Sequence, residues 1–427
     1  MPLAHGVGGT QDLPIPAFYA YAGGFAALLV SFLALGLLWP EPRYAGATAG
    51  RPLPRAVQRL AASPALRRSA AAAGLAAAAF VAGHLLLGPD DPARNPAPGA
   101  VYVLLWVGLV PASLLLGPVW RLLNPLRTLH ALACRALGRD PSAGRPLPPW
   151  LGHRPAAAGL LAFTWLELAA PEPAATTALS AFLAAHAAVQ LTGAALHGER
   201  WFAQCDPFEA YSALLARLSP VGRRPADGVL VLRSPLAGLD ATPALPGLTA
   251  VLCVLLGSTA YDGFSAAPSW IDTLQTSSLG RTATATLGLL AAVALVAALY
   301  AACAAAVRLV SGRLAHPLSA FAHSLLPIAL GYLVAHYFTL FVTEGPRTVT
   351  IASGTDNPPP ADPLLSPGGL AALQVLAVVT GHVLGVVAAH DRAVRLFPAA
   401  RAVAGQLPLL ALMVCYTVGG LTLLLAA

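Results

Sequence analysis

A small set of ionisable residues falls inside long apolar segments, and these residues are the ones that could do chemistry. Such groups are costly in a bilayer and mark ion pathways, proton relays or reactive sites. His84, Glu167, Asp262 and His336 are predicted to lie toward the outer ends of their segments. This composition suits a proton site or a divalent ion such as zinc, which would supply hydroxide from bound water near pH 7. The pattern predicts His84, Asp262 and His336 as metal ligands, and Asp262, His336 and Glu167 as catalytic groups.

The spacing of these residues is less specific than their types. Ser258 lies one helical turn from Asp262, and Tyr332 lies one turn from His336, so either hydroxyl could orient its neighbour. No H-E-x-x-H spacing is present, and for any single buried histidine a hydrogen bond to a neighbouring helix is the more common role. A second set lies centrally or toward the inner side, where it could provide further stations for a transported ion: His186, His323 and His382.

The elements that must position these groups are membrane helices. Hydrophobic residues make up 57% of the 427-residue chain and charged residues 10%, too few charges to cover a soluble surface. Ten apolar runs have about the 20 residues that cross a bilayer, and their backbone must be helical. The sequence predicts an all-α polytopic transmembrane helix bundle, with residues 1–427 as a single integral membrane domain. The runs are approximately 17–39, 69–87, 100–120, 155–171, 174–197, 246–264, 283–308, 318–342, 369–390 and 406–426.

The arginines predict the orientation of these runs. All 25 basic residues are arginine, and they concentrate in alternate gaps between the runs. If the first run passes from outside to inside, only Arg94, Arg281 and Arg347 remain on the outer side. Positive charge in short loops favours the cytoplasmic side. We therefore expect a protein of the bacterial plasma (inner) membrane with both termini outside, although runs 155–171 and 174–197 are separated only by a short Pro-Glu-Pro turn.

The remaining composition limits the partners. The net charge of +7 lies beside helix ends, where it suits anionic lipid headgroups rather than nucleic acid. The lipid bilayer is thus the expected partner, with an apolar small molecule or an ion as a possible ligand. The five cysteines form no C-x-x-C pair, which disfavours thiolate metal sites. High alanine, arginine and proline usage without lysine is typical of a high-GC bacterium.

Two inner gaps begin with related sequences. NPLRTLHALACRALGR starts at Asn124, and DPFEAYSALLARLSPVGR starts at Asp206. Asn or Asp followed by proline is a favoured helix start. Apolar residues then recur at helical spacing, which predicts two short amphipathic helices along the inner membrane surface.

Several longer phrases resemble actinobacterial multi-pass membrane proteins catalogued as fenitrothion hydrolases. The opening AHGVGGTQDLPIP carries this likeness, as do GSTAYDGFS and AHSLLPIALGYLVAHYFTLFV. The resemblance implies hydrolysis of an apolar organophosphate triester. Such a substrate would partition into the bilayer, so a site within the membrane would be reasonable.

Three functions therefore remain open. The chain could be a metal-dependent membrane hydrolase that uses the outer residues. It could be a transporter or channel in which polar groups succeed one another across the bilayer. It could also be a scaffold or assembly factor whose buried polar groups only join helices.

Overall fold

The computed structural model describes residues 17–311, 317–398, 401 and 404–426. Helices account for 73% of the chain and strands for 2%, which confirms the all-α prediction. The opening motif and the predicted outer position of the N-terminus lie outside the described residues.

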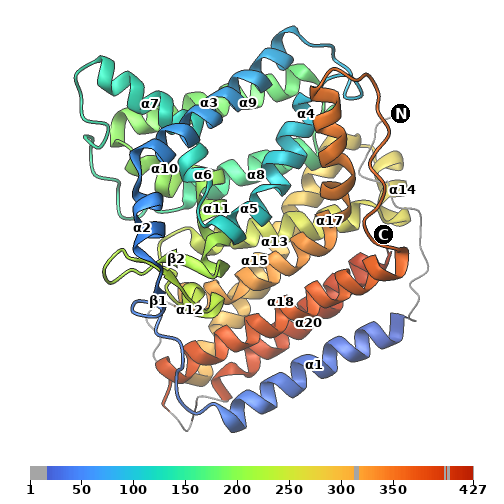
Figure 1. The fold of residues 1–427 in the computed structure, drawn as a ribbon. Coiled ribbons are helices and arrows are strands. Elements are labelled where there is room, and N and C mark those ends of the chain that lie inside the picture. Colours follow the sequence, from blue (N-terminus) through green and yellow to red (C-terminus); the bar gives the residue numbers. More distant parts are fainter. Residues whose placement is uncertain (1–16, 312–316, 399–400, 402–403, 427) are drawn as a thin grey trace.

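Within the described part of the chain, nine helices are long and apolar enough to cross a membrane. Most of them lie side by side as one bundle (Figure 1). They are α1 (Ala17–Leu38), α3 (Pro64–Leu87), the continuous α4, η1 and α5 (Ala97–Gly99, Ala100–Val107, Leu109–Leu116), α9 (Thr176–His197), α13 (Leu248–Ser265), α15 (Arg281–Ser311), η3 with α17 (Ala322–Ser324, Leu325–Ala352), α18 (Pro367–Leu396) and η4 with α20 (Ala404–Gln406, Leu407–Ala426).

Shorter elements connect these helices. They are α2 (Arg55–Ala62), α6 (Trp120–Leu123), α7 (Pro125–Ala136), α8 (Arg154–Leu168), α10 (Arg200–Cys205), α11 (Pro207–Leu215), η2 (Ala216–Leu218), α12 (Pro235–Asp240), α14 (Pro268–Thr276) and α16 (Pro317–Ala320). A small antiparallel sheet of order β1-β3-β2 joins Arg51–Pro52, Leu230–Leu232 and Val221–Arg223.

Two predicted runs differ from the helices observed. The run 155–171 corresponds to α8, which has 15 residues and is about 22 Å long at 1.5 Å per residue. The predicted run 318–342 ends too early in the sequence, because α17 continues through Pro346 to Ala352. Proline removes one intrahelical hydrogen bond and favours a kink, but the surrounding turns keep this helix intact.

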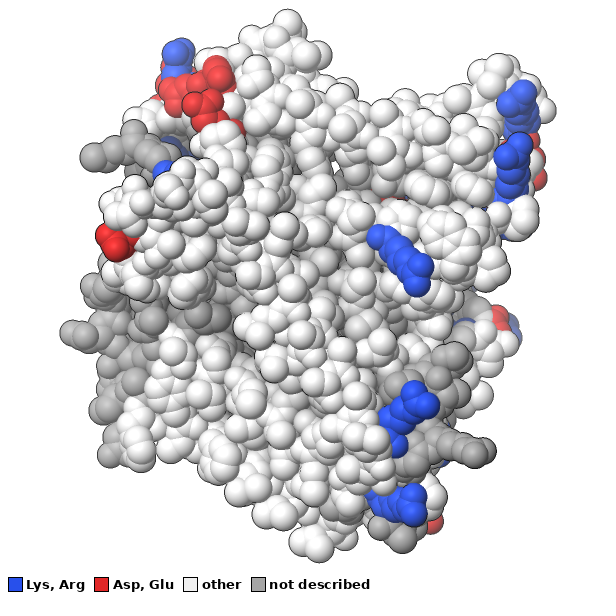
Figure 2. Space-filling model, turned by 180° about the vertical axis from the view of Figure 1, so that it is seen from behind, with Lys and Arg blue, Asp and Glu red and all other residues white. Residues whose placement is uncertain are grey.

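Contacts between the connecting segments define two ends of the bundle. At one end the sheet joins residues 51–52 to residues 221–232. At the other end the backbone N–H of Thr176 donates to Asp90, and Tyr102 donates to the carbonyl of Pro173 at 2.7 Å. In each case, the segments that meet are ones that the arginine pattern assigns to the same side. Figure 2 shows most of the visible arginines toward one side of the molecule, a mainly acidic group that includes arginine at the opposite edge, and almost no charge between them.

Close approach of small residues holds the helices together. Helices α17 and α18 pack so tightly that a Cβ on Gly381 would lie 2.5 Å from the carbonyl oxygen of Pro327. A Cβ on Gly331 would lie 2.4 Å from the carbonyl oxygen of Ala377. Such backbone approach is typical of membrane bundles, in which dispersion contacts rather than water exclusion hold helices together.

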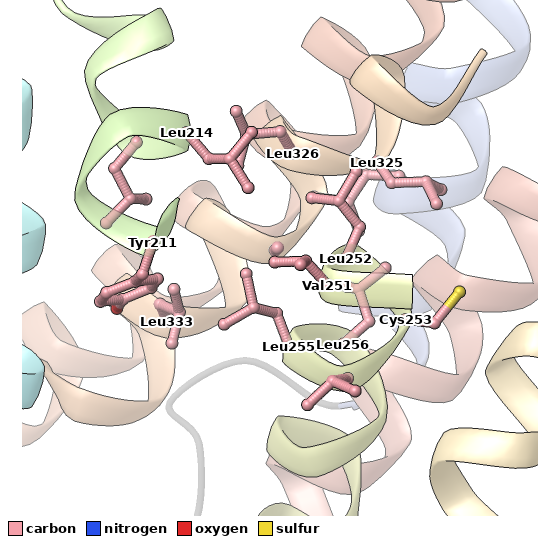
Figure 3. Packing of buried hydrophobic residues seen from close by; sticks show 14 of the residues in the cluster. Tyr211, Leu214, Val251, Leu252, Cys253, Leu255, Leu256, Leu325, Leu326 and Leu333 are labelled. Carbon is pink, nitrogen blue, oxygen red and sulfur yellow. The ribbon is translucent and has the colours of Figure 1, made fainter. Parts of the chain in front are cut away.

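Helix α11 corrects one prediction about the two interfacial helices. Both proline-started helices form, and Asn124 and Asp206 cap them as predicted. However, α11 is buried along almost its whole length instead of lying on the membrane surface. Figure 3 shows Tyr211 and Leu214 of α11 within a cluster that includes Leu333 of α17 and Leu255 of α13. Its apolar residues meet the protein core on several sides, so its amphipathic spacing was misleading.

A polar network fastens the end of the bundle that carries the sheet. The carboxylate of Asp240 accepts hydrogen bonds from Arg392 at 3.0 Å, from Arg395 at 3.1 Å and from the backbone N–H of Gly46 at 3.0 Å. Burial alone would raise the pKa of Asp240, but these donors outweigh it and hold the pKa below its usual value. The network therefore joins α12, the end of α18 and the segment after α1.

We expect Asp240→Asn to lower stability by about 2 kcal/mol at pH 7, between the values for exposed and buried pairs. Because the folded pKa is depressed, the ionised carboxylate stabilises the fold above about pH 4, and this contribution disappears as the pH falls through the folded pKa. Thermal unfolding of the detergent-solubilised protein at pH 7 and pH 3 measures the difference. The control Asp227→Asn removes an exposed ion pair with Arg224 and should change little. Equal destabilisation by Asp240→Asn at both pH values would contradict this assignment.

Candidate functional site

The Asp262 carboxylate is the centre of a buried polar site. Asp262 lies in the last turn of α13 and is 3% exposed. Its Oδ2 atom is 2.9 Å from Nε2 of His336 and 2.8 Å from the hydroxyl of Tyr337. When Asp262 is ionised, Nε2 of His336 carries the proton of this hydrogen bond, and Tyr337 donates a second one. The structure thus brings two of the predicted residues into direct contact.

Tyr337 is a site residue that sequence reasoning missed. It follows His336 in α17, and neighbouring helical residues point about 100° apart. Both can reach one carboxylate because Asp262 lies between them, with the two rings at 84° and 4.8 Å between centroids. No local pattern in the sequence distinguishes such a tyrosine from an ordinary core residue. The predicted helper Ser258 instead donates to the carbonyl of Leu255 in its own helix.

Glu167 contributes a second buried carboxyl group to this region. It is 5% exposed and lies near the end of α8, a helix that packs against both α13 and α11. The ring of Tyr211 in α11 stacks on Trp106 with 4.6 Å between centroids. Within the described residues, the Tyr211 hydroxyl has no hydrogen-bond partner. A protonatable group and a polar hydroxyl therefore lie on helices that pack against those of the Asp262 site.

His84 does not belong to this site. Its Nδ1 lies 3.0 Å from the carbonyl of Phe80, and it lines a separate cavity of about 550 Å³ together with Arg94 and Ile351. Ile351 and His336 are both in α17, 15 residues apart, which is about 22 Å along the axis. The structure therefore brings Asp262 and His336 together but does not bring His84, the third predicted ligand, to them. These three residues come from different helices, and a similar predicted depth in the membrane does not imply that two helices are neighbours.

The donor set does not fit a metal ion. The described residues contain no group of three or more His, Cys, Asp and Glu side chains placed to hold one. Asp262 and His336 direct their ligating atoms at one another at 2.9 Å, whereas an ion between them would need about 2 Å to each atom. The pair is a hydrogen-bonded acid–base couple in this arrangement, which can exchange a proton without a metal.

A second buried polar cluster lies where the capped ends of α7 and α11 meet. Nδ2 of Asn124 donates to Oδ2 of Asp206 at 3.3 Å, so the two predicted caps contact each other. Arg127 makes two hydrogen bonds to Glu209, at 2.8 and 3.2 Å, and one to Glu199 at 3.1 Å. Burial raises the pKa of Asp206 to about 6, although its hydrogen bonds and Arg127 oppose the rise.

This second cluster reaches deep into the bundle along α9. Trp201 of α10 donates to Gln190 at 2.8 Å, and Nε2 of His186 lies 3.9 Å from Asp206. His186 precedes the end of α9 at His197 by 11 residues, or about 16 Å. Helix α10 thus runs back along α9 and carries Asp206 inward from the end of the bundle.

The other predicted histidines have separate surroundings. His382 is buried, with Nδ1 2.8 Å from the carbonyl of Val378 and with no hydrogen-bond partner for Nε2 among the described residues. His323 is buried in η3. Neither is joined to the Asp262 site by a hydrogen bond or ion pair identified among the described residues.

No family model, curated protein or solved structure matches this chain. The geometry of the two polar clusters is therefore the basis for any functional conclusion.

We expect the purified protein to keep its melting temperature after treatment with EDTA, because the Asp262–His336 pair is complete without an ion. Asp262→Ala should instead destabilise it by about 3 kcal/mol, since His336 and Tyr337 lose a buried acceptor. Metal analysis and thermal unfolding measure both effects. The exposed Asp272 in α14 provides the control Asp272→Ala. Stoichiometric zinc that disappears in Asp262→Ala/His336→Ala would contradict the metal-free interpretation.

Proposed function

We propose that this chain is a multi-pass protein of the bacterial inner membrane that binds and transfers protons at the Asp262–His336 pair, as part of a proton-linked carrier. The observation that carries the proposal is the direct contact of a buried carboxylate with an imidazole and a phenol inside an apolar bundle. Ionisable groups kept at such a position mark proton or ion pathways.

We further propose ten spans with both termini outside, as the arginines indicate. Helix α8 is the tenth span, and its contacts support this role. At its start, Nδ1 of His153 lies 2.9 Å from the carbonyl of Gln204 in α10, the helix that follows the predicted inner end of α9. Beyond its end, Pro173 accepts from Tyr102 and Thr176 donates to Asp90. A helix shorter than the others can still connect the two sides where neighbouring protein surrounds it.

The order of the polar groups favours transfer across the membrane over a single reactive site. Asp262 and Glu167 lie toward the outer end, and Asp206 and Glu209 lie toward the inner end. Helix α11 links them, because it packs against α8, which carries Glu167, while Asp206 caps its start. Glu199, whose side chain is 47% exposed, provides a contact with water at the inner end.

Proton flux into proteoliposomes tests this proposal. Under an imposed pH gradient, we expect the wild-type protein to acidify or alkalinise the lumen. Asp262→Asn should reduce the rate by more than about tenfold, because the amide keeps the size of the side chain but cannot carry the proton. Asp272→Asn is the matched control on the exposed surface. Wild-type protein without flux, alone or with small solutes present, would contradict the proposal.

A second candidate is hydrolysis of apolar phosphotriesters, as the resemblance to fenitrothion hydrolases implies. It is supported by one feature: the carboxylate of Asp262 orients the His336 imidazole, whose side chain is 21% exposed. An imidazole held in this way could take a proton from an attacking water. We expect any hydrolysis of fenitrothion by the purified protein to be lost in His336→Ala and retained in His84→Ala. Activity that persists in His336→Ala would exclude this site, and a protein with neither flux nor hydrolysis would favour a scaffold.

A further inference from the structure

Helix α2 (Arg55–Ala62) has an amphipathic pattern whose apolar side faces away from the protein. Val57, Leu60 and Ala61 lie on one side of the helix, and Arg55, Gln58 and Arg59 lie on the other. Val57 is 39% exposed, Leu60 is 63% exposed, and α2 has no buried residue. A helix on a water-facing surface would normally turn such a side toward the protein core.

The polar side of α2 attaches it to the rest of the chain. Nε2 of Gln58 donates to the carbonyl of Leu230, and Oε1 of Gln58 accepts from the N–H of Leu230 at 3.1 Å. These two bonds join α2 to β3 in the small sheet. The apolar side is therefore held outward by polar contacts on the opposite side of the helix, and this orientation needs an apolar medium to cover Val57 and Leu60.

The charge around α2 indicates which medium this is. Residues 51–68 contain no acidic residue, and all of their arginines are exposed: Arg51, Arg55, Arg59, Arg67 and Arg68. This concentration of positive charge is complementary to phosphate-bearing, anionic headgroups. Each arginine near an anionic membrane surface strengthens binding, and an arginine stem can lie along apolar surface while its guanidinium reaches phosphate.

The position of α2 also places it at the edge of the bilayer. Only Ser63 separates α2 from the membrane-crossing helix α3, which begins at Pro64. In Figure 1, α2 lies at the same end of the bundle as the sheet and α10. This is the end that the arginine pattern predicts to be cytoplasmic.

We propose that α2 is an interfacial helix that binds anionic phospholipid. Val57 and Leu60 enter the boundary between headgroups and acyl chains, and Arg55, Arg59, Arg67 and Arg68 contact lipid phosphates. The sheet holds the helix at the correct height through Gln58. This site is separate from the Asp262 region, and its test does not depend on proton flux.

Lipid selectivity provides the first test. Wild-type protein in nanodiscs should bind spin-labelled phosphatidylglycerol in preference to spin-labelled phosphatidylcholine. Arg55→Gln/Arg59→Gln should reduce that preference on the order of tenfold, as expected for the loss of two surface charges. The matched control Arg139→Gln/Arg145→Gln removes two exposed arginines from the loop between α7 and α8, at the same end of the bundle. Equal loss in both double variants would overturn a specific site at α2.

The depth of Leu60 in the membrane provides the second test. It also distinguishes lipid from other molecules that could cover α2. A spin label at Leu60→Cys, with the partly exposed Cys134 and the exposed Cys415 changed to serine, should be accessible to oxygen and protected from a water-soluble nickel complex. The protection should be greater in bilayers that contain phosphatidylglycerol. A water-accessible label would overturn the proposal. Spin–spin broadening would instead indicate that a second copy of the chain covers the helix. If inorganic phosphate added to phosphatidylcholine bilayers protected the label equally well, the site would bind phosphate without lipid specificity.

Discussion

Hydrocarbon provides no hydrogen-bond partner, and the arrangement of this protein depends on that constraint. Each polar group that enters the bundle must find its partner inside the protein. Asp262 shows the consequence most clearly, since a carboxylate that is 3% exposed receives hydrogen bonds from both His336 and Tyr337. The same requirement explains why Arg127 is fastened by two carboxylates and why Asn124 and Asp206 meet at two helix starts. Polar contacts thus select specific helix neighbours in a bundle whose apolar surfaces are nearly uniform.

The two polar clusters differ in how they are built. At the Asp262 site, two long helices bring side chains together directly, and the hydrogen bonds leave the carboxylate and imidazole able to exchange a proton. In the second cluster, the short helix α10 runs back into the bundle, and Arg127 forms hydrogen bonds with two acidic side chains, Glu199 and Glu209. Helix α11 contacts both regions, because Asp206 is its cap and the helix packs against α8, which carries Glu167.

The distribution of charge on the surface follows from the same constraint, because charged side chains are stable only where they can be solvated. Most of the arginines visible in Figure 2 lie toward one end of the molecule, and a wide area with almost no charge lies between the two ends. Helix α2 belongs to this boundary, since its polar side bonds to the sheet and its apolar side is turned outward.

Local chemistry allowed the sequence alone to predict the helical class, the approximate limits of nine long apolar helices, and the caps at Asn124 and Asp206. These features depend on the cost of charge in hydrocarbon and on residues a few positions apart. Tertiary structure decided which polar residues meet: it joined Asp262 to His336, added Tyr337, excluded His84 and buried α11. The spanning helices are apolar on most sides, so no hydrophobic stripe indicates which side faces a neighbour. The packing of small residues between helices, as at Gly331 and Gly381, acts together with the buried polar contacts to set their rotation and hence the composition of the site.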